Sequence, residues 1–309
     1  MSRRLTLIEL LLVVFILAAV AASAATLTDD VDVQARYDVT ASRREQVRRA
    51  ILGEAQAVSG FVADMGRLPT GLDELLQPGT LQTWAFDATY GAGAGWRGPY
   101  LSAQFKDGQP VFRDGWGNDW QLWPAAGAAG YGEKLDLVSL GRDGLSVAST
   151  ELADQDFPAY PAGYDRDASD HLVLVPAASW RVSAPTWAIT LTLRNESGAL
   201  FTTPVRLRLN VPNVGAAVDW STSSVISAVV DPAALFAADG GILPNQSRDV
   251  EFQFTPATPL VAGSWTLQVI EQATATLVGP AQPSLPVVIR ARAALPTRVP
   301  SSSSWIVAQ

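Results

Sequence analysis

The chain of 309 residues contains no cysteine and a single histidine, His171. The absence of cysteine excludes disulfides, thiolate metal sites and thiol nucleophiles, so stability must come from packed cores or bound ions. No Gly-x-Ser-x-Gly, His-Glu-x-x-His or Gly-Lys-Ser/Thr pattern accompanies the lone imidazole. A carboxylate pair for glycoside cleavage stays open, although the sequence singles out no such pair. We therefore expect that the protein is not an enzyme.

Charged residues are also scarce, at 17% of the chain, and the net charge is −8. This balance lacks the basic surface that nucleic-acid binding requires, so we expect no nucleic-acid partner. Hydrophobic residues make up 48% of the chain, which is enough to fill well-packed cores. The length exceeds one typical domain and predicts two folded units after the amino-terminal segment.

The longest apolar run lies between Leu5 and Leu27, and the carboxylate of Glu9 interrupts it. As a helix this run would extend about 35 Å, which suffices to cross the hydrocarbon core of a bilayer. Arg3 and Arg4 precede the run and predict a cytoplasmic amino end by the positive-inside rule. We therefore expect a single-pass membrane protein whose remaining domains are exported.

Glu9 is the informative residue of this run. A carboxylate inside a membrane helix costs about 2.5–3.5 kcal/mol on insertion scales, so it needs a partner such as a cation on a neighbouring chain. Two alternatives are a cleavable secretory signal ending at residues 22–24, Ala-Ser-Ala, and a plain signal anchor. Glu9 disfavours both, because an acid in the apolar region gives neither of them an advantage.

Residues 6–10, Thr-Leu-Ile-Glu-Leu, with the Leu-Leu-Val-Val that follows them, resemble the amino-terminal signature of type IV pilins and type II secretion pseudopilins. The resemblance implies cutting by a prepilin peptidase between Arg4 and Leu5, and helix assembly through Thr6 and Glu9. Arg4 replaces the family's glycine, and Leu5 replaces its methylated phenylalanine. Poor processing, an uncleaved chain and a misplaced start are therefore all open.

A second group of sequence patterns is similar to the major pseudopilin, so that the resemblance covers residues 5–157. In order, these patterns are Phe61–Pro69, Leu72–Leu75, Gly95–Leu101, Asp114–Asn118 and Leu137–Gly144. They are rich in glycine, aspartate and asparagine, which favour tight turns. The tryptophans among and beside them are expected to pack against a small core: Trp96, Trp116, Trp120 and Trp123.

Two helical stretches are predicted in this part of the chain. Apolar residues recur at helical spacing from Val33 to Met65, after a polar segment at residues 28–32, and Gly66 and Pro69 should end the helix. A short helix follows at residues 72–76.

The resemblance also implies a calcium site, because pseudopilins bind calcium in the loop after their Ser-Leu-Gly-x-Asp-Gly pattern. Asp143 and Asp154 match the family's aspartates, and the carbonyls of Leu140 and Ser139 would complete the set. Calcium takes six to eight oxygen ligands, which this loop could supply. The alternative is a solvated acidic turn.

The second half of the chain has the texture of an all-β domain. Short runs with strand character recur between turn signals. They are His171–Val175, Trp187–Leu193, Val205–Val211, Val250–Phe254 and Trp265–Ile270. Such spacing favours an immunoglobulin-like or fibronectin-like β-sandwich.

Together these patterns predict an α+β protein with a long amino-terminal membrane-spanning helix, a small pilin-like α/β head and an all-β immunoglobulin-like sandwich. The expected boundaries are 1–27 for the signal and transmembrane helix, 28–157 for the head, 158–170 for a linker, 171–295 for the sandwich and 296–309 for a flexible tail.

The expected function is that of a structural subunit in a type II secretion or pilus-like apparatus of the inner membrane, with its later domains in the periplasm. Its expected partners are the inner membrane, other pilin-like subunits, a prepilin peptidase and a secreted protein. The alternative is a membrane-tethered binding or adhesion module that does not polymerise.

Overall fold

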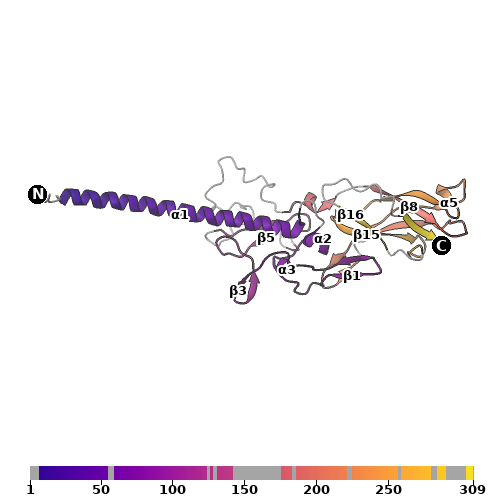
Figure 1. Cartoon of the computed structure of the whole chain (residues 1–309), viewed down its shortest axis with the longest axis horizontal. Coiled ribbons are helices and arrows are strands. Elements are labelled where there is room, and N and C mark those ends of the chain that lie inside the picture. Colours follow the sequence, from indigo (N-terminus) through magenta and orange to yellow (C-terminus); the bar gives the residue numbers. More distant parts are fainter. Residues whose placement is uncertain are drawn as a thin grey trace. The chain divides into compact units, whose positions relative to one another are not determined.

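The computed structural model shows an α+β protein with few helices and many short strands (Figure 1). It describes residues 7–54, 59–123, 126–127, 131–141, 175–182, 186–220, 225–256, 259–279, 284–289 and 304–308. The predicted linker at residues 158–170 lies outside these ranges.

The longest element is helix α1, Leu7–Leu52, with 46 residues. It continues through the polar segment at residues 28–32 without a break. The helix ends at Gly53, whose φ of 75° is left-handed and whose N–H donates to the Arg49 carbonyl at 2.7 Å. Glycine is the residue that adopts this conformation at little cost.

The prediction of one helix from Val33 to Met65 is therefore wrong. Gly53 and Gly60 both have positive φ, and helix α2, Phe61–Met65, starts only after them. The predicted short helix is confirmed as α3, Asp73–Leu76. The helical periodicity placed a set of apolar residues on the inner face of the predicted helix. After Glu45, the members of this set that the structure describes are fully buried: Val47, Ile51, Phe61 and Met65.

Short strands follow these helices. They are β1 Ala85–Asp87, β2 Ala92–Ala94, β3 Gln104–Lys106, β4 Gln109–Val111, β5 Gln121–Trp123 and β6 Asp136–Val138. Strands β1 and β2 form an antiparallel hairpin, and β3 and β4 form another.

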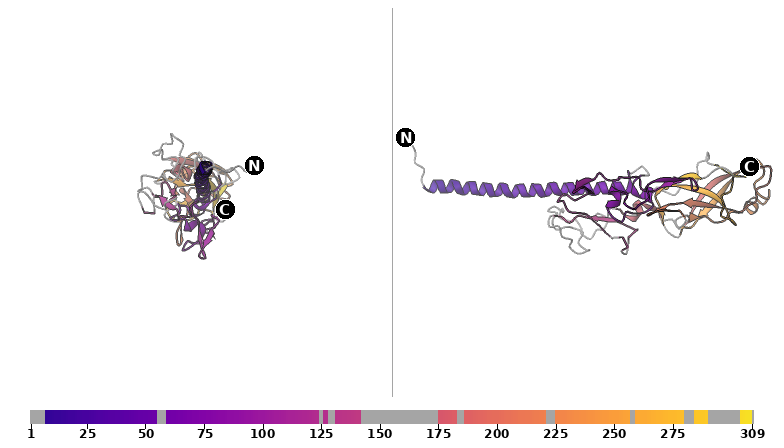
Figure 2. Two further views of the ribbon diagram at one scale, coloured as in Figure 1. Left: turned by 90° about the vertical axis from the view of Figure 1, so that its left-hand side faces the viewer. Right: turned by 90° about the horizontal axis from the view of Figure 1, so that it is seen from below.

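We call the described residues from Val175 to Ala308 the β-domain. Its main strands are β8 Trp187–Asn195, β9 Val205–Asn210, β12 Val225–Ile226, β13 Ser247–Phe254, β15 Gly263–Glu271, β16 Leu285–Ile289 and β17 Ser304–Ala308. They form a four-stranded sheet in the order β12-β9-β15-β16 and a three-stranded sheet in the order β13-β8-β17. Figure 2 draws these strands in the salmon to yellow colours of the second half of the chain. Smaller elements are η1 Ala177–Ser179, β7 Arg181–Val182, β10 Asn213–Val214, β11 Val218–Asp219, α5 Pro232–Leu235 and β14 Leu260–Val261.

One hydrophobic core lies between the two sheets. Along β8 every second residue from Trp187 onward is buried, which is the pattern of a strand with one face on a core. The same core contains Phe252 on β13 and both Leu207 and Leu267 on the other sheet. Antiparallel pairing of β8 with β13 over eight residue pairs fixes the register of these apolar side chains.

Four of the predicted strands are confirmed as β8, β9, β13 and β15. The predicted strand at 171–175 falls outside the described residues except for Val175, which forms an isolated bridge with Leu135. Strand β16 was not predicted, and Pro286 within it explains why the sequence does not resemble a strand.

The prediction of a flexible tail is wrong for residues 304–308. They form β17, which pairs in parallel with β8, and the side chain of Trp305 is fully buried. The indole Nε1 donates to the Val278 carbonyl at 2.6 Å. A serine-rich composition predicts a loose tail, but one buried tryptophan with a satisfied N–H is enough to fix a strand.

The chain divides into two compact units. One comprises Met1–Glu45, Arg113–Gln121 and Leu137–Leu172, and the other comprises Gln46–Phe112, Leu122–Asp136 and Val173–Gln309. Within the second unit we call residues 46–112 the head segment, which is a shorter range than the head predicted at residues 28–157. The head segment and the β-domain thus belong to one compact unit.

Candidate functional site

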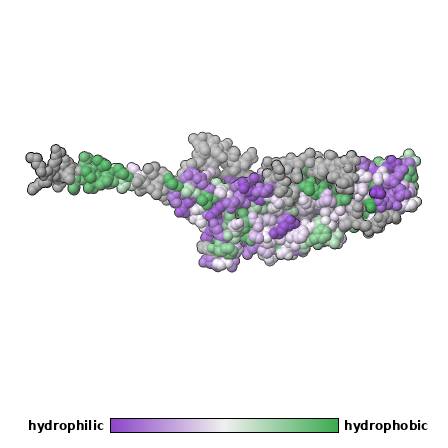
Figure 3. Space-filling view, viewed as in Figure 1, coloured by the Kyte–Doolittle hydropathy of each residue, from purple (hydrophilic) through white to green (hydrophobic). Residues whose placement is uncertain are grey.

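The amino-terminal part of α1 exposes apolar side chains on all sides. Ile8 is 78% exposed and Phe15 is 68% exposed, and the large apolar residues between and after them are exposed as well: Leu10, Leu11, Leu12, Val13, Val14, Ile16, Leu17 and Val20. Figure 3 shows this part of the helix as a hydrophobic surface. A helix that is apolar all round needs a surrounding of lipid or of other apolar helices.

The residues predicted for processing and assembly are only partly within the described part of the chain. Arg4, Leu5 and Thr6 lie outside it. Glu9 is in α1, but its side chain is not among those described. Among the described residues, no helix has both the length and the mean hydropathy that crossing a membrane requires.

The turn at Asp114 joins several backbone and side-chain groups of the first compact unit. The buried carboxylate accepts hydrogen bonds from the backbone N–H groups of Trp116 and Asn118, at 3.0 and 2.8 Å, and from the Ser139 hydroxyl at 2.7 Å. Asn118 in turn donates its side-chain amide to the Gly141 carbonyl. The Asp114–Asn118 and Leu137–Gly144 patterns, which are far apart in the sequence, thus meet at one carboxylate.

Helix α1 also forms hydrogen bonds with this turn. The Arg43 guanidinium donates to the carbonyls of Arg113 and Asp114 at 2.8 and 2.7 Å, and the Thr40 hydroxyl accepts from the Gly115 N–H at 2.9 Å. A Cβ on Gly115 would lie 2.1 Å from the Arg36 carbonyl oxygen, so only glycine fits against the helix there.

Two of the four predicted calcium ligands lie within the described residues. Ser139 and Leu140 lie inside it, next to the Asp114 turn, whereas Asp143 and Asp154 lie outside it. The Ser139 hydroxyl is engaged with Asp114 and with the Gly141 N–H, so its carbonyl is the group that could face a cation. In the described ranges, no group of three or more histidine, aspartate or glutamate side chains is placed to hold a metal ion.

Arg67 and Glu74 form the main ion pair of the head segment. The two guanidinium nitrogens contact the two carboxylate oxygens at 2.8 and 3.1 Å, and Thr70 donates both its N–H and its hydroxyl to the same carboxylate. Burial raises the pKa of Glu74, but the hydrogen bonds from Arg67 and Thr70 outweigh burial and leave this pKa lowered.

A second polar cluster surrounds Asp64. The Tyr100 hydroxyl donates to its carboxylate at 2.9 Å, and the Arg97 guanidinium lies 3.8 Å away. Burial raises the pKa of Asp64, and the hydrogen bond from Tyr100 and the charge of Arg97 offset only part of that rise. Burial likewise raises the pKa of Tyr100.

The predicted packing role is supported for two of the four tryptophans, Trp96 and Trp120. Trp96 contacts Tyr100 edge-to-face at 5.8 Å between ring centroids, and its Nε1 donates to the Glu74 carbonyl. Trp120 is buried. The side chain of Trp123 lies outside those described.

The Arg67–Glu74 and Asp64–Tyr100 pairs were not predicted from the sequence. Both fall inside patterns quoted above, at residues 61–69, 72–75 and 95–101. These patterns contain the charged and aromatic residues concerned, but a single sequence does not show which of them meet.

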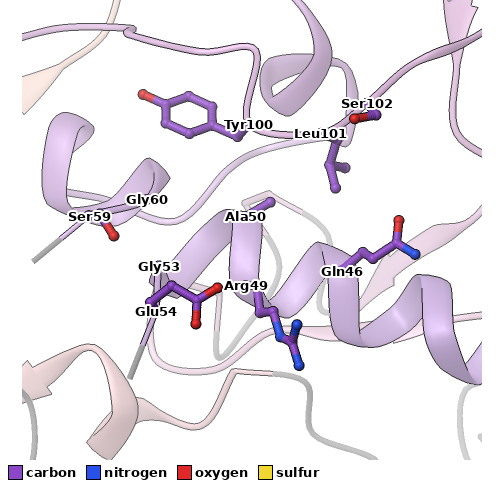
Figure 4. Close-up of a pocket in the computed structure, with 10 residues that line it drawn as sticks. All are labelled: Gln46, Arg49, Ala50, Gly53, Glu54, Ser59, Gly60, Tyr100, Leu101 and Ser102. Atoms are coloured by element: carbon purple, nitrogen blue, oxygen red, sulfur yellow. The ribbon is translucent and has the colours of Figure 1, made fainter. Parts of the chain in front are cut away.

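A cavity of about 370 Å³ lies beside the carboxyl end of α1 in the second compact unit. Figure 4 shows that its walls come from the last turns of α1, from Ser59 and Gly60, and from residues 100–102. Polar side chains dominate its lining: Gln46, Arg49, Glu54, Ser59, Tyr100 and Ser102.

Comparison with known protein families gives one match. Residues 37–156 match the family of protein G of the type II secretion system (T2SS), which is less than half of the chain. The resemblance to the pseudopilin family is therefore confirmed for this part, and it supports a pseudopilin-like role in type II secretion with other pilin-like subunits as partners. No curated protein and no solved structure matches the chain.

Proposed function

We propose that this chain, pseudopilin-like over residues 37–156, is a structural, non-catalytic subunit that assembles through its amino-terminal helix into a type II secretion or pilus-like apparatus. The observation that carries the proposal is the all-round exposure of apolar side chains from Ile8 to Val20. Such a surface is stable only in a bilayer or among other apolar helices. We place the helix in the inner membrane as a single pass, with the later domains in the periplasm.

The assembly contact in this proposal is the carboxylate of Glu9. In the apolar interior of a fibre it would pair with the free amino terminus of a neighbouring subunit, or with Arg3 or Arg4 if the chain stays uncleaved. We assign Thr6, three positions before Glu9 in the sequence, to the same contact. Removing the charge should therefore weaken contacts between subunits without weakening insertion, because a neutral side chain is cheaper to bury.

Cross-linking between single-cysteine subunits tests this assembly, because the natural chain has no cysteine. Val13→Cys on the exposed helix should give disulfide-linked dimers on oxidation in membranes, and adding Glu9→Gln should reduce them at least tenfold. Asp38→Asn, on the polar part of the same helix, is the matched control and should leave the dimers unchanged. An unchanged yield of dimers with Glu9→Gln would contradict the proposal and favour a tethered module that does not polymerise.

We also propose calcium binding by Asp143 and Asp154 with the Leu140 and Ser139 carbonyls. The support is the family match, which includes both aspartates, and the fixed position of Ser139 against Asp114. Calcium should raise the melting temperature of the full chain in detergent. An equal melting temperature in chelator and in excess calcium would contradict the site.

For the β-domain we propose an immunoglobulin-like sandwich. Its support is the pair of sheets with four and three main strands around one core, most of them antiparallel. A bulky exported domain of this kind fits a subunit that contacts a secreted protein or another subunit.

A further inference from the structure

The loop of hairpin β1–β2 is hydrogen-bonded to the β-domain through side chains of β15. The Thr266 hydroxyl donates to the Tyr90 carbonyl at 2.7 Å, and the Gln268 side-chain amide donates to the Thr89 carbonyl at 2.7 Å. Residues 89 and 90 belong to the head segment, more than 170 positions earlier in the chain. The side chains of Thr266 and Gln268 in the β-domain thus donate hydrogen bonds to backbone carbonyls of the head segment.

These two side chains are part of a buried polar ladder across β9 and β15, formed by Arg208, Asn210, Thr266 and Gln268. The side-chain oxygen Oε1 of Gln268 accepts from the Arg208 guanidinium at 2.6 Å and from the Asn210 side-chain amide at 2.9 Å. Asn210 and Gln268 are fully buried. Buried amides are costly unless they are hydrogen-bonded, so the ladder is stable only with its acceptors in place.

Aromatic packing covers the same place. The rings of Tyr90 and Trp220 stack with centroids 4.9 Å apart, and the Arg208 guanidinium lies 5.6 Å from the Tyr90 centroid. Trp220 is buried. The contact therefore combines a hydrophobic element with the polar ladder.

A second contact is made at hairpin β10–β11. The Gln82 N–H donates to the Gly215 carbonyl at 3.0 Å, and the Gln82 side-chain oxygen accepts from the Val218 N–H at 2.9 Å. Arg67, besides pairing with Glu74, donates to the Val214 carbonyl at 2.8 Å.

The backbones approach closely beside this second contact. A Cβ on Gly66 would lie 2.0 Å from the carbonyl oxygen of Pro212, and the φ of Gly66 is 72°. Only glycine permits this approach. The head segment and the β-domain therefore fit together at two separate places.

The burial pattern of β15 agrees with these contacts. All residues from Trp265 to Ile270 are buried, whereas β8 alternates between buried and partly exposed residues. A strand buried on both faces has a core on one side and a cover on the other. On β15 the cover includes hairpin β1–β2 of the head segment.

We infer that the head segment is a structural layer of the β-domain, so that the two unfold as one cooperative unit and the β-domain does not swing as a separate module. This inference does not depend on fibre assembly or on calcium. It makes the β-domain a rigid extension of the head segment.

The test uses the full chain in detergent, with one cysteine added at a time. Ala92→Cys reports on hairpin β1–β2, and Val250→Cys reports on the core of the β-domain, because both side chains are buried. Pulsed labelling with a thiol reagent across a urea series should give one common midpoint, coincident with circular dichroism of each chain. Labelling of the hairpin cysteine at clearly lower urea than the core cysteine would overturn the inference.

A variant of the polar ladder extends the test. Gln268→Leu leaves the Thr89 carbonyl without its donor and should lower both labelling midpoints by the same amount. The matched control is Gln253→Leu on the exposed face of β13, which should leave both midpoints in place. A shift of the hairpin cysteine alone would overturn cooperative unfolding, and if Gln268→Leu does not fold, the two midpoints of the parent chains still decide.

Discussion

At the scale of single residues, Arg67 does more than pair with one acid. Its guanidinium contacts Glu74 and donates to the carbonyls of Leu68 and Val214. Arg67→Ala would remove two hydrogen bonds from a largely buried carboxylate, which keeps those from Thr70, and would remove the Arg67 donor from the Val214 carbonyl. Because breaking a buried pair costs several kcal/mol and this pair is partly exposed, we expect a loss of about 2–3 kcal/mol.

Urea denaturation of the full chain in detergent measures this loss. Arg113→Ala is the control, because its partner Asp119 is 76% exposed and such surface pairs contribute about 0–1 kcal/mol. Equal losses for the two variants would show that Arg67 acts only as one more surface charge.

Asp64 and Glu74 should give opposite pH dependences. The pKa of Glu74 is lowered in the folded chain, so its stabilisation is present above the unfolded pKa and is lost as pH falls through the folded pKa. The pKa of Asp64 is raised, so its carboxylate increasingly destabilises the fold as pH rises from the unfolded towards the folded pKa.

Asp64→Asn should therefore gain stability relative to the parent chain as pH rises above about 4. Glu74→Gln should lose stability relative to the parent chain as pH rises towards about 4.3, and its difference should stay constant above that pH. Melting temperatures between pH 3 and pH 7 measure both differences. Parallel profiles for the two variants would contradict the assignment of opposite shifts.

At the scale of elements, β17 shows how much one side chain can fix. Trp305 is fully buried in the shared core, so Trp305→Ala should destabilise the chain by about 3–5 kcal/mol. Trp84→Ala provides a control of the same chemistry, because the Trp84 indole is 40% exposed. Thermal unfolding of the two variants compares them, and a similar small effect for both would mean that β17 is dispensable.

The elements also show what the sequence predicts well. Apolar and polar residues alternate along β8, β9 and β13, because one face of each strand packs on the core and the other is more exposed to solvent. This alternation is a local signal, so it predicts these strands. The break of the long helix depends on the φ of Gly53 and Gly60, which a helical periodicity does not reveal. Strand β17 depends on a distant core, and serine-rich composition hides it.

In the candidate site, too, local patterns could be predicted from the sequence, whereas the contacts between them could not. The patterns around Asp114 and Ser139 were recognisable one by one, but their meeting at one carboxylate requires the folded chain. The contacts of Gln268 with Thr89 and of Thr266 with Tyr90 join residues about 180 positions apart. No periodicity or motif in a single sequence encodes such a pairing.

At the scale of the whole molecule, the proposal fixes which parts lie on which side of the membrane. Arg3 and Arg4 precede the apolar part of α1, and positive charge is retained on the cytoplasmic side. The β-domain should then be exported. A membrane-impermeant thiol reagent distinguishes the two sides, because the natural chain has no cysteine to react.

Gly198→Cys places a thiol in an exposed turn of the β-domain, where an added Cβ meets no atom within 4 Å. In cells without prepilin peptidase, so that residues 1–4 are retained, a permeabilised outer membrane should allow labelling of this variant, whereas Ser2→Cys should be labelled only after lysis. The two variants differ in nothing but the end of the chain that carries the thiol. Labelling of Ser2→Cys in intact cells, or protection of Gly198→Cys, would reverse the proposed orientation and remove the basis for assembly from the inner membrane.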